Sequence, residues 1–183
     1  TIKDPKKASL SIIYHNFGYL ASNMGDYALA KKHYAKSIKM MQASSSKDYE
    51  NLHKTYNALG GMMWYSAKLD SSLYFFNKAL KILDKTDKKP INTFYRKALV
   101  NSNIAVLNQS LGRIDEAIES SKEVINNYQK FIDVSKDESY KLRALKNQLA
   151  AIDNLGSFYH SMGEFERADK LIAYSYQKKK KKL

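Results

Sequence analysis

YHNFGYLASNMGDYALAKKHYAKS, residues 14–37, places small residues at fixed offsets between large apolar ones. Gly18 lies inside the first apolar segment, Gly25 follows that segment, and Ala30 precedes Tyr34 by four residues in the second. Apolar residues spaced by three and four predict amphipathic helices, and a glycine between two such segments predicts a turn. The stretch therefore predicts two antiparallel helices that pack closely across a tight turn.

The pattern of this stretch recurs three times downstream, which indicates a repeat architecture. The small residue of the first segment recurs as Gly18, Gly60, Ala105 and Gly156, at intervals of 42, 45 and 51 residues. A larger side chain there would hold the two helices of a pair apart, and the close contact offsets the cost of about 1 kcal/mol for glycine inside a helix. In the third copy, Ser121 replaces the large residue of the second segment. The residues predicted to pack the helix pairs are Gly18, Ala30, Tyr34, Gly60, Phe76, Ala79, Ala105, Ala117, Gly156 and Ala168.

Apolar spacing also predicts the helix bounds. Ser135 and Glu138 have the spacing of a capping box, which predicts that the fourth repeat starts there. The sequence thus predicts an all-α fold, a right-handed α-solenoid of about four antiparallel helix pairs, or about eight helices, that fills residues 1–183 as a single domain. The predicted repeats cover about 6–43, 48–84, 91–133 and 138–180, followed by a basic tail at 178–183. Their first helices are predicted at 6–24, 48–66, 91–111 and 138–162, and their second helices at 27–43, 70–84, 115–133 and 165–180.

These repeats resemble the tetratricopeptide repeat family, whose pattern sets Leu-Gly and an aromatic residue on the first helix and small and aromatic residues on the second. The second copy has Tyr56, Leu59 and Gly60 at matching offsets, and the resemblance extends from about Ser9 to about Gln177. The repeat-ending proline is missing, and the period exceeds the usual length of about 34 residues. The long period is similar to that of repeats in kinesin light chains and in bacterial signalling and regulatory proteins. The resemblance implies a non-enzymatic scaffold that binds a protein or a peptide.

In such a solenoid the first helices line the concave face, so the residues beside their packing positions form the candidate binding groove. Amide side chains bond a peptide backbone in both directions, and aromatic side chains anchor apolar ones. Packing between repeats is the alternative role for Trp64. Some family members hold a carboxylate with Lys, Asn and Arg from successive first helices, whereas the matching positions here are His15, Tyr19, Gly61, Leu99 and Asn103. The candidate groove residues are His15, Tyr19, Asn23, Lys54, Asn57, Trp64, Tyr65, Asn103, Val106, Gln109, Asp153, Asn154, Ser157 and His160.

The chain has a formal net charge of +13, and five of its lysines stand in a row at Lys178–Lys182. Such a run indicates polyanion or membrane-surface binding as one alternative function. The basic residues are not interleaved with aromatic stacking residues, so the sequence does not favour a nucleic acid as the partner. Self-assembly into a homo-oligomer is a second alternative, because Ile172, Tyr174 and Tyr176 leave apolar surface on the last repeat.

Several kinds of chemistry have no basis in the sequence. The chain has no cysteine, its four histidines form no metal-binding pair, and it has neither a phosphate-binding loop nor a nucleophile motif. It also has no run of about 20 apolar residues, the length that spans a bilayer. We therefore predict no enzyme activity, no cofactor, no metal site and no transmembrane segment.

The leading hypothesis is a peptide-binding scaffold that serves as a regulatory or sensor segment of a larger signalling protein. The chain opens on Thr1 instead of Met, which indicates a processed form or a fragment. A cytoplasmic location fits this hypothesis, as does a periplasmic one for a segment of a membrane-anchored sensor.

Overall fold

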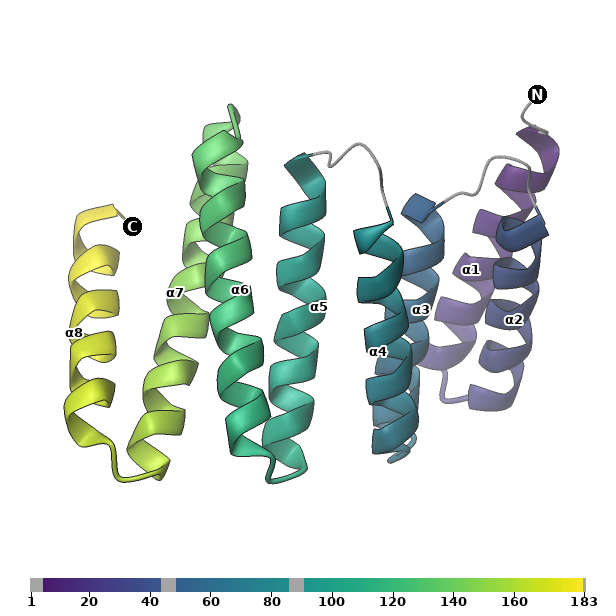
Figure 1. Ribbon diagram of the computed structural model, residues 1–183. Helices are drawn as coiled ribbons and strands as arrows, with labels where there is room; N and C mark the ends of the chain where they lie inside the picture. Colours follow the sequence, from purple (N-terminus) through teal and green to yellow (C-terminus); the bar gives the residue numbers. More distant parts are fainter. Residues whose placement is uncertain (1–4, 44–48, 86–90, 183) are drawn as a thin grey trace. The chain divides into compact units, whose positions relative to one another are not determined.

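The computed structural model describes residues 5–43, 49–85 and 91–182, which form eight α-helices (Figure 1). The all-α prediction is confirmed, and the helix bounds differ from the predicted ones by two residues at most. Residue 48, the predicted start of one helix, and Leu183 of the predicted tail lie outside the described residues. The helices are α1 (Pro5–Asn23), α2 (Tyr27–Ala43), α3 (Tyr49–Tyr65), α4 (Leu69–Asp84), α5 (Ile91–Ser110), α6 (Ile114–Val134), α7 (Glu138–Ser161) and α8 (Phe165–Lys182).

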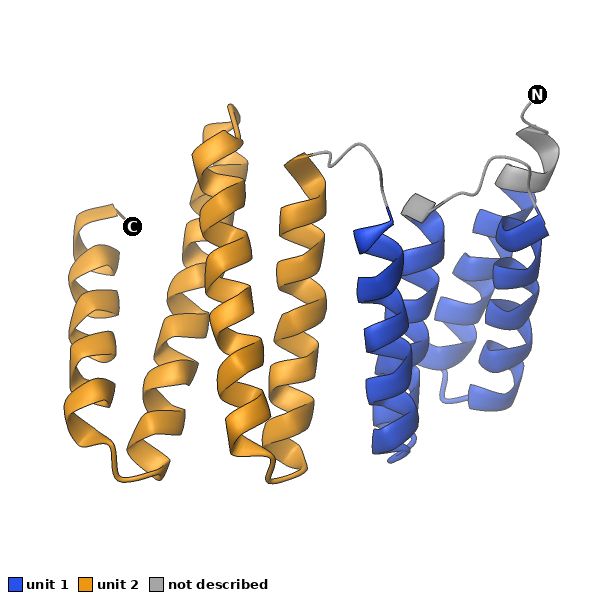
Figure 2. Cartoon of the chain, viewed as in Figure 1, with its two compact units in different colours: residues 1–87 blue, residues 88–183 orange. Residues whose placement is uncertain are grey.

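The chain forms two compact units, and each holds two of the predicted repeats (Figure 2). In unit 1, Thr1–Asp87, α1 packs against α2, α3 packs against α4, and α3 also contacts α1 and α2. In unit 2, Lys88–Leu183, each helix packs against the next, from α5 to α8. A single solenoid domain over residues 1–183 stays a prediction.

A glycine of the first helix faces a large side chain of the second helix in both hairpins of unit 1. A Cβ atom at Gly18 would lie 2.7 Å from the ring of Tyr34, and one at Gly60 would lie 2.5 Å from the ring of Phe76. Both rings are fully buried, with exposures of 1% and 0%. The helices of unit 1 therefore approach so closely that only glycine fits beneath these rings.

The two hairpins of unit 2 differ from this arrangement. Gly156 of α7 faces Ile172 of α8, where a Cβ atom would lie 3.0 Å from Cγ1 of the isoleucine. In the α5–α6 hairpin the corresponding residues are Ala105 and Ser121, which are both buried. All ten residues predicted to pack the hairpins lie at buried positions.

Two apolar clusters join the helices of unit 2. One brings together residues of α5, α6 and α7, and the other brings together residues of α6 and α7, with Leu171 of α8 packed against it. The first contains Ala98, Val124, Tyr128, Phe131, Ala144 and Ala151, and the second contains Ala117, Ile118, Leu155 and Phe158. Helix α7 thus lies against α6 through residues from both clusters.

The turn inside each hairpin contains one residue in the left-handed region of backbone conformation. Three of these residues are glycines, Gly25, Gly112 and Gly163, with φ of 81°, 71° and 79°. The fourth is Ala67, with φ of 56°. This conformation brings the Cβ atom of an L-residue close to the carbonyl oxygen that follows it, at a cost of roughly 1–2 kcal/mol.

One local prediction is wrong. The cap of α7 is Asp137, whose carboxylate accepts hydrogen bonds from the backbone N–H groups of Ser139 and Tyr140, whereas Ser135 ends α6. A carboxylate at this place also meets the positive end of the helix dipole. The hydrogen bond that the Ser139 hydroxyl donates to it, together with the two backbone hydrogen bonds, lowers the pKa of Asp137. Helix α8 continues to Lys182, two residues beyond its predicted end at residue 180, because lysine favours helix and a cation stabilises the C-terminal end.

Candidate functional site

In unit 1 the candidate groove residues follow one stripe along α1 and α3. Tyr19, Asn23 and Lys54 are exposed, and so is Tyr65, at 81%. Asn57 and Trp64 are half-buried. The stripe therefore combines aromatic rings open to solvent with polar side chains from two neighbouring first helices.

The side chain of His15 lies in the contact between α1 and α3 and is only partly exposed. Its Nδ1 lies 2.9 Å from the hydroxyl oxygen of Thr55, and its ring packs against Tyr34. Burial, together with the charge of Lys54, lowers the pKa of His15. The imidazole is therefore neutral at pH 7 and joins the two repeats of unit 1.

In unit 2 most of the candidate residues lie on the surface of α5 and α7. Val106 and Gln109 of α5 are exposed, and Asn103 is half-buried. On α7, Asn154, Ser157 and His160 are exposed. The side chain of Asp153 is directed to the next helix instead, where its carboxylate forms an ion pair with Lys179 of α8.

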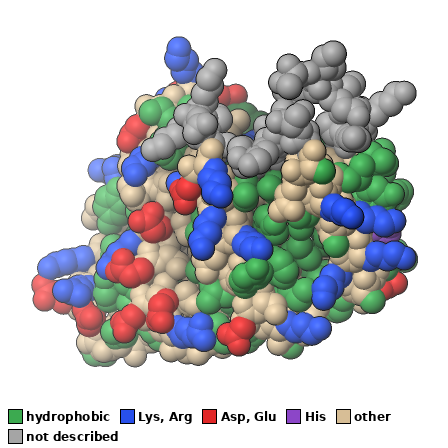
Figure 3. Space-filling view, turned by 45° about the vertical axis from the view of Figure 1, so that its right-hand side comes forward, with side chains coloured by type: hydrophobic (Ala, Val, Ile, Leu, Met, Phe, Trp, Pro, Cys, Tyr) green, Lys and Arg blue, Asp and Glu red, His purple; other side chains and the backbone are tan. Residues whose placement is uncertain are grey.

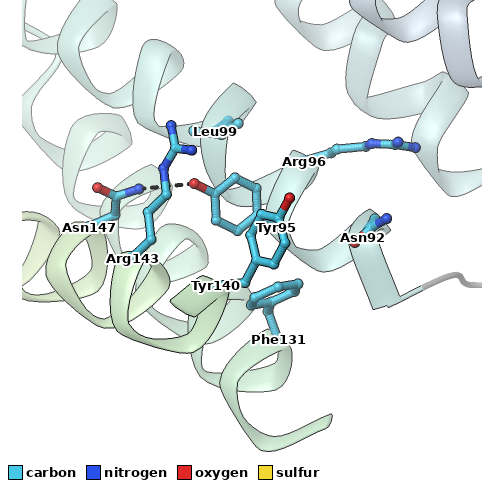
Figure 4. A pocket seen from close by; sticks show the side chains of 8 residues that line it. All are labelled: Asn92, Tyr95, Arg96, Leu99, Phe131, Tyr140, Arg143 and Asn147. Carbon is cyan, nitrogen blue, oxygen red and sulfur yellow. Dashed lines mark hydrogen bonds between the residues drawn. The ribbon is translucent and has the colours of Figure 1, made fainter. Parts of the chain in front are cut away.

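A pocket with a volume of about 380 Å³ lies at the N-terminal ends of α5 and α7 (Figure 4), within the size range of ligand sites. The rings of Tyr95 and Tyr140 lie next to each other there, with Phe131 of α6 beneath them. Arg143 extends past the Tyr95 hydroxyl. The residues that line it are Asn92, Tyr95, Arg96, Leu99, Phe131, Tyr140, Arg143 and Asn147.

Hydrogen bonds fix the floor of this pocket. The side-chain amide of Asn147 donates to the hydroxyl oxygens of Tyr95 and Tyr128, at 3.4 and 3.3 Å. Burial raises the pKa of Tyr128 to about 12, so its hydroxyl stays protonated. Tyr95 also packs edge-on against the rings of Tyr128 and Phe131. These contacts hold Tyr95 in one position and present its ring to a ligand.

The charged side chains that line the pocket are all positive. Its two charged lining residues, Arg96 and Arg143, are both cationic, and no Asp or Glu is among the residues that line it. Guanidinium groups bind carboxylates through two parallel hydrogen bonds. The pocket can therefore take an apolar or aromatic group on its floor and an acidic group at its rim.

The predicted stripe of unit 2 misses this pocket, although the same spacing leads to it. Asn103 and Val106 continue backwards on α5 through Leu99 and Arg96 at steps of four and three, and Asn154 does so on α7 through Asn147 to Arg143. The prediction covers the C-terminal halves of these helices, and the pocket lies two turns earlier on the same face. Extending the spacing to the helix starts would have included Leu99, Arg96, Asn147 and Arg143 in the stripe, but it would not have shown that a pocket lies there.

A second cavity, of about 510 Å³, lies among α6, α7 and α8. Its apolar residues include Ile132, Leu142 and Tyr174, and its basic residues include Lys178 and Lys182. It contains none of the candidate groove residues, because it faces the second helices of the repeats. Part of the predicted basic tail thus lines a cavity.

The described residues contain no group of three or more His, Cys, Asp or Glu side chains that could hold a metal ion. Within the same residues, no helix has the length and apolar character needed to cross a membrane.

Comparison with known proteins places the helical hairpins of unit 1 in a family. Residues 9–85 match the tetratricopeptide repeat model. Repeats of this family generally mediate protein–protein interactions and are typically non-catalytic scaffolds. A comparison with curated proteins found no match.

The fold is similar to that of a solved structure, BtubC (BKLC) from P. vanneervenii, with a TM-score of 0.58 and 18% sequence identity over 95% of this chain and 82% of that one. At this identity the likeness concerns the fold alone. The family match therefore concerns the two helix pairs of unit 1, which are similar to tetratricopeptide repeats.

Proposed function

We propose that this chain is a protein-binding scaffold that holds an extended peptide segment of its partner along the first helices of each unit. The observation that supports this proposal most directly is the pocket between α5 and α7, with its aromatic floor and its rim of arginine and asparagine side chains. The stripe of Tyr19, Asn57 and Tyr65 is the corresponding surface of unit 1.

The lining of the pocket favours an acidic peptide. Arg143 and Arg96 can pair with Asp, Glu or a C-terminal carboxylate, while the rings of Tyr95 and Tyr140 can hold an apolar side chain of the same segment. The asparagine amides can bond the peptide backbone as donors and as acceptors. A basic or wholly polar peptide would leave the arginines facing like charge or the rings without a partner.

The test starts from an unbiased probe, a phage-displayed library of random peptides selected on the full chain. We expect selected peptides that combine an acidic residue with an aromatic or aliphatic one. Tyr140→Ala and Arg143→Ala should each weaken their binding by at least about tenfold, a change of about 1.4 kcal/mol. Tyr140 is exposed, so its removal should leave the circular dichroism spectrum unchanged.

Tyr174→Ala is the matched control, because Tyr174 has a similar exposure but lines the other cavity of unit 2. Selected peptides that bind Tyr140→Ala and Arg143→Ala as tightly as the original chain would refute the assignment of the pocket. Tyr65→Ala tests the surface of unit 1 in the same assay. The regulatory or sensor role within a larger signalling protein belongs to this proposal and rests on the long repeat period.

A further inference from the structure

Helix α1 has a row of apolar side chains that stay exposed, although the ring of one of them, Phe17, also contacts His33 of α2. On the face that Figure 3 shows, apolar side chains gather in the middle and at the right. The exposures of the α1 side chains run from 40% to 84%. They follow one another at steps of three, four, three and four residues, the spacing of a helix face that packs against another helix. We call this row the α1 stripe; it consists of Leu10, Ile13, Phe17, Leu20 and Met24.

The same positions in the other repeats show what kind of element covers such a face. In α3 the equivalents of the first four residues are Leu52, Thr55, Leu59 and Met62, and all four are buried. In α7 they are Gln148, Ala151, Leu155 and Phe158, which are also buried. Helix α3 lies against α2 and α1, and α7 lies against α6. The face is thus one that receives a helix, and on α1 it is open.

The contacts of α7 show the arrangement in detail. Leu155 and Phe158 pack with Ala117 and Ile118 of α6, and the amide of Gln148 donates to the backbone carbonyl of Ile125. The covering helix α6 precedes α7 directly in sequence and runs antiparallel to it (Figure 1). An antiparallel helix with an apolar face is therefore the partner that this kind of stripe accepts.

The chemistry of α1 fits a copy of itself. Residues 9–25 contain no Asp, Glu, Lys or Arg, so two such faces can meet without burying an unpaired charge, which would cost several kcal/mol. The outer face of α8 is less suitable: it has Asp169 and Lys179 at the positions where α6 has Ile118 and Tyr128. The α8 end is therefore the more polar one, as expected of a terminal cap.

We propose that two copies of this chain associate through their α1 stripes, antiparallel and related by a two-fold axis. The antiparallel direction matches that of the α6–α7 contact. One helix pair buries a small area, at the low end of about 1,200 Å² or less for weak specific interfaces. The dimer should therefore form with rising concentration, and salt should strengthen it by screening the net positive charge.

Sedimentation equilibrium of the full chain, over concentrations from micromolar to several hundred micromolar, measures this association. We expect a monomer–dimer equilibrium whose dissociation constant falls as salt rises. Leu20→Lys should weaken the dimer by at least about tenfold, because a lysine would be buried within the seam, one step from its central residue Phe17. Tyr19→Lys is the matched control, since Tyr19 has the same 55% exposure as Leu20 and lies on the groove face of the same helix.

A chain that stays monomeric at the highest concentration and salt would overturn the proposal, as would a dimer that Leu20→Lys leaves intact. A dimer that Tyr176→Lys abolishes instead would place the contact on α8. The chain has no cysteine, so Met24→Cys adds a single thiol to each copy and tests the relative orientation of the two α1 helices. Antiparallel helices keep the two added thiols apart, and a disulfide between them under mild oxidation would contradict the proposed orientation.

Discussion

The α3–α4 and α5–α6 hairpins solve the same packing problem with opposite choices of residue size. In α3–α4, Gly60 leaves room for the ring of Phe76, which is fully buried. In α5–α6, the first helix has Ala105 and the second has Ser121, both buried. A glycine faces a large ring in the first hairpin, and the corresponding positions of the second hairpin hold two small residues. Interiors are close-packed, so a change in the size of one of the two residues requires a matching change in the other. The two residues together therefore determine how closely the helices pack.

This comparison changes the meaning of the third repeat. By sequence it is the copy that departs most from the pattern, because it lacks both the glycine and the large residue. By structure the two departures compensate each other: alanine occupies volume that glycine leaves empty, and serine gives up volume that phenylalanine fills. Alanine also favours the helix by about 1 kcal/mol over glycine.

The largest expected effect on stability comes from removing the large side chain of the α3–α4 pair, that of Phe76. Phe76→Ser should destabilise unit 1 by about 3–5 kcal/mol, the usual cost of removing a buried aromatic side chain. Urea unfolding followed by the fluorescence of Trp64, the single tryptophan, measures unit 1 directly. A loss below about 1 kcal/mol would contradict the view that this ring fills the contact.

A smaller effect on stability is expected from Gly60→Ala, and its sign should depend on whether Phe76 is present. Gly60→Ala should cost about 1–2 kcal/mol. The added Cβ would lie only 2.5 Å from the buried ring, so overpacking should cost about 2–3 kcal/mol, the upper part of its usual range, and the gain in helix propensity offsets about 1 kcal/mol. In the Phe76→Ser background the clash is gone, so the same change should stabilise unit 1 by about 1 kcal/mol. The double-mutant cycle would then give a coupling of roughly 2–3 kcal/mol. Additive effects of the two substitutions would show that the two positions do not form a pair.

The α7–α8 hairpin provides a graded control for this cycle. Gly156 faces Ile172, whose Cγ1 would lie 3.0 Å from an added Cβ, and Ile172 is 44% exposed. An exposed side chain can move aside, so Gly156→Ala should change stability by less than about 0.5 kcal/mol. Circular dichroism during urea unfolding reports the helices of unit 2. If Gly156→Ala destabilised unit 2 as much as Gly60→Ala destabilises unit 1, the burial of the Phe76 ring would not explain the cost of Gly60→Ala.

The sequence predicts the helices and their pairing because apolar spacing determines both. It predicts less of the candidate site. Asn154 and Ser157 were predictable as surface residues from their place in the spacing, but the pairing of Asp153 with Lys179 depends on α8 continuing through a run of lysines. Helix spacing gives the face of a residue, and it does not give the turn at which two helices leave a pocket such as that at Tyr95.

The smallest effects return to the same two hairpins at their turns, where the residue choices are again different. Ala67 of α3–α4 and Gly112 of α5–α6 both have positive φ, and an added Cβ at Gly112 would meet no atom within 4 Å. Ala67→Gly relieves backbone strain of about 1–2 kcal/mol but adds freedom to the unfolded chain worth about 0.4–1 kcal/mol. The net gain should be about 0.5 kcal/mol in unit 1, and Gly112→Ala should cost unit 2 a similar amount. Changes of the same sign in the two unfolding curves would contradict this account. With opposite signs, backbone strain at the turn, like side-chain size at the contact, would be adjusted separately within each hairpin.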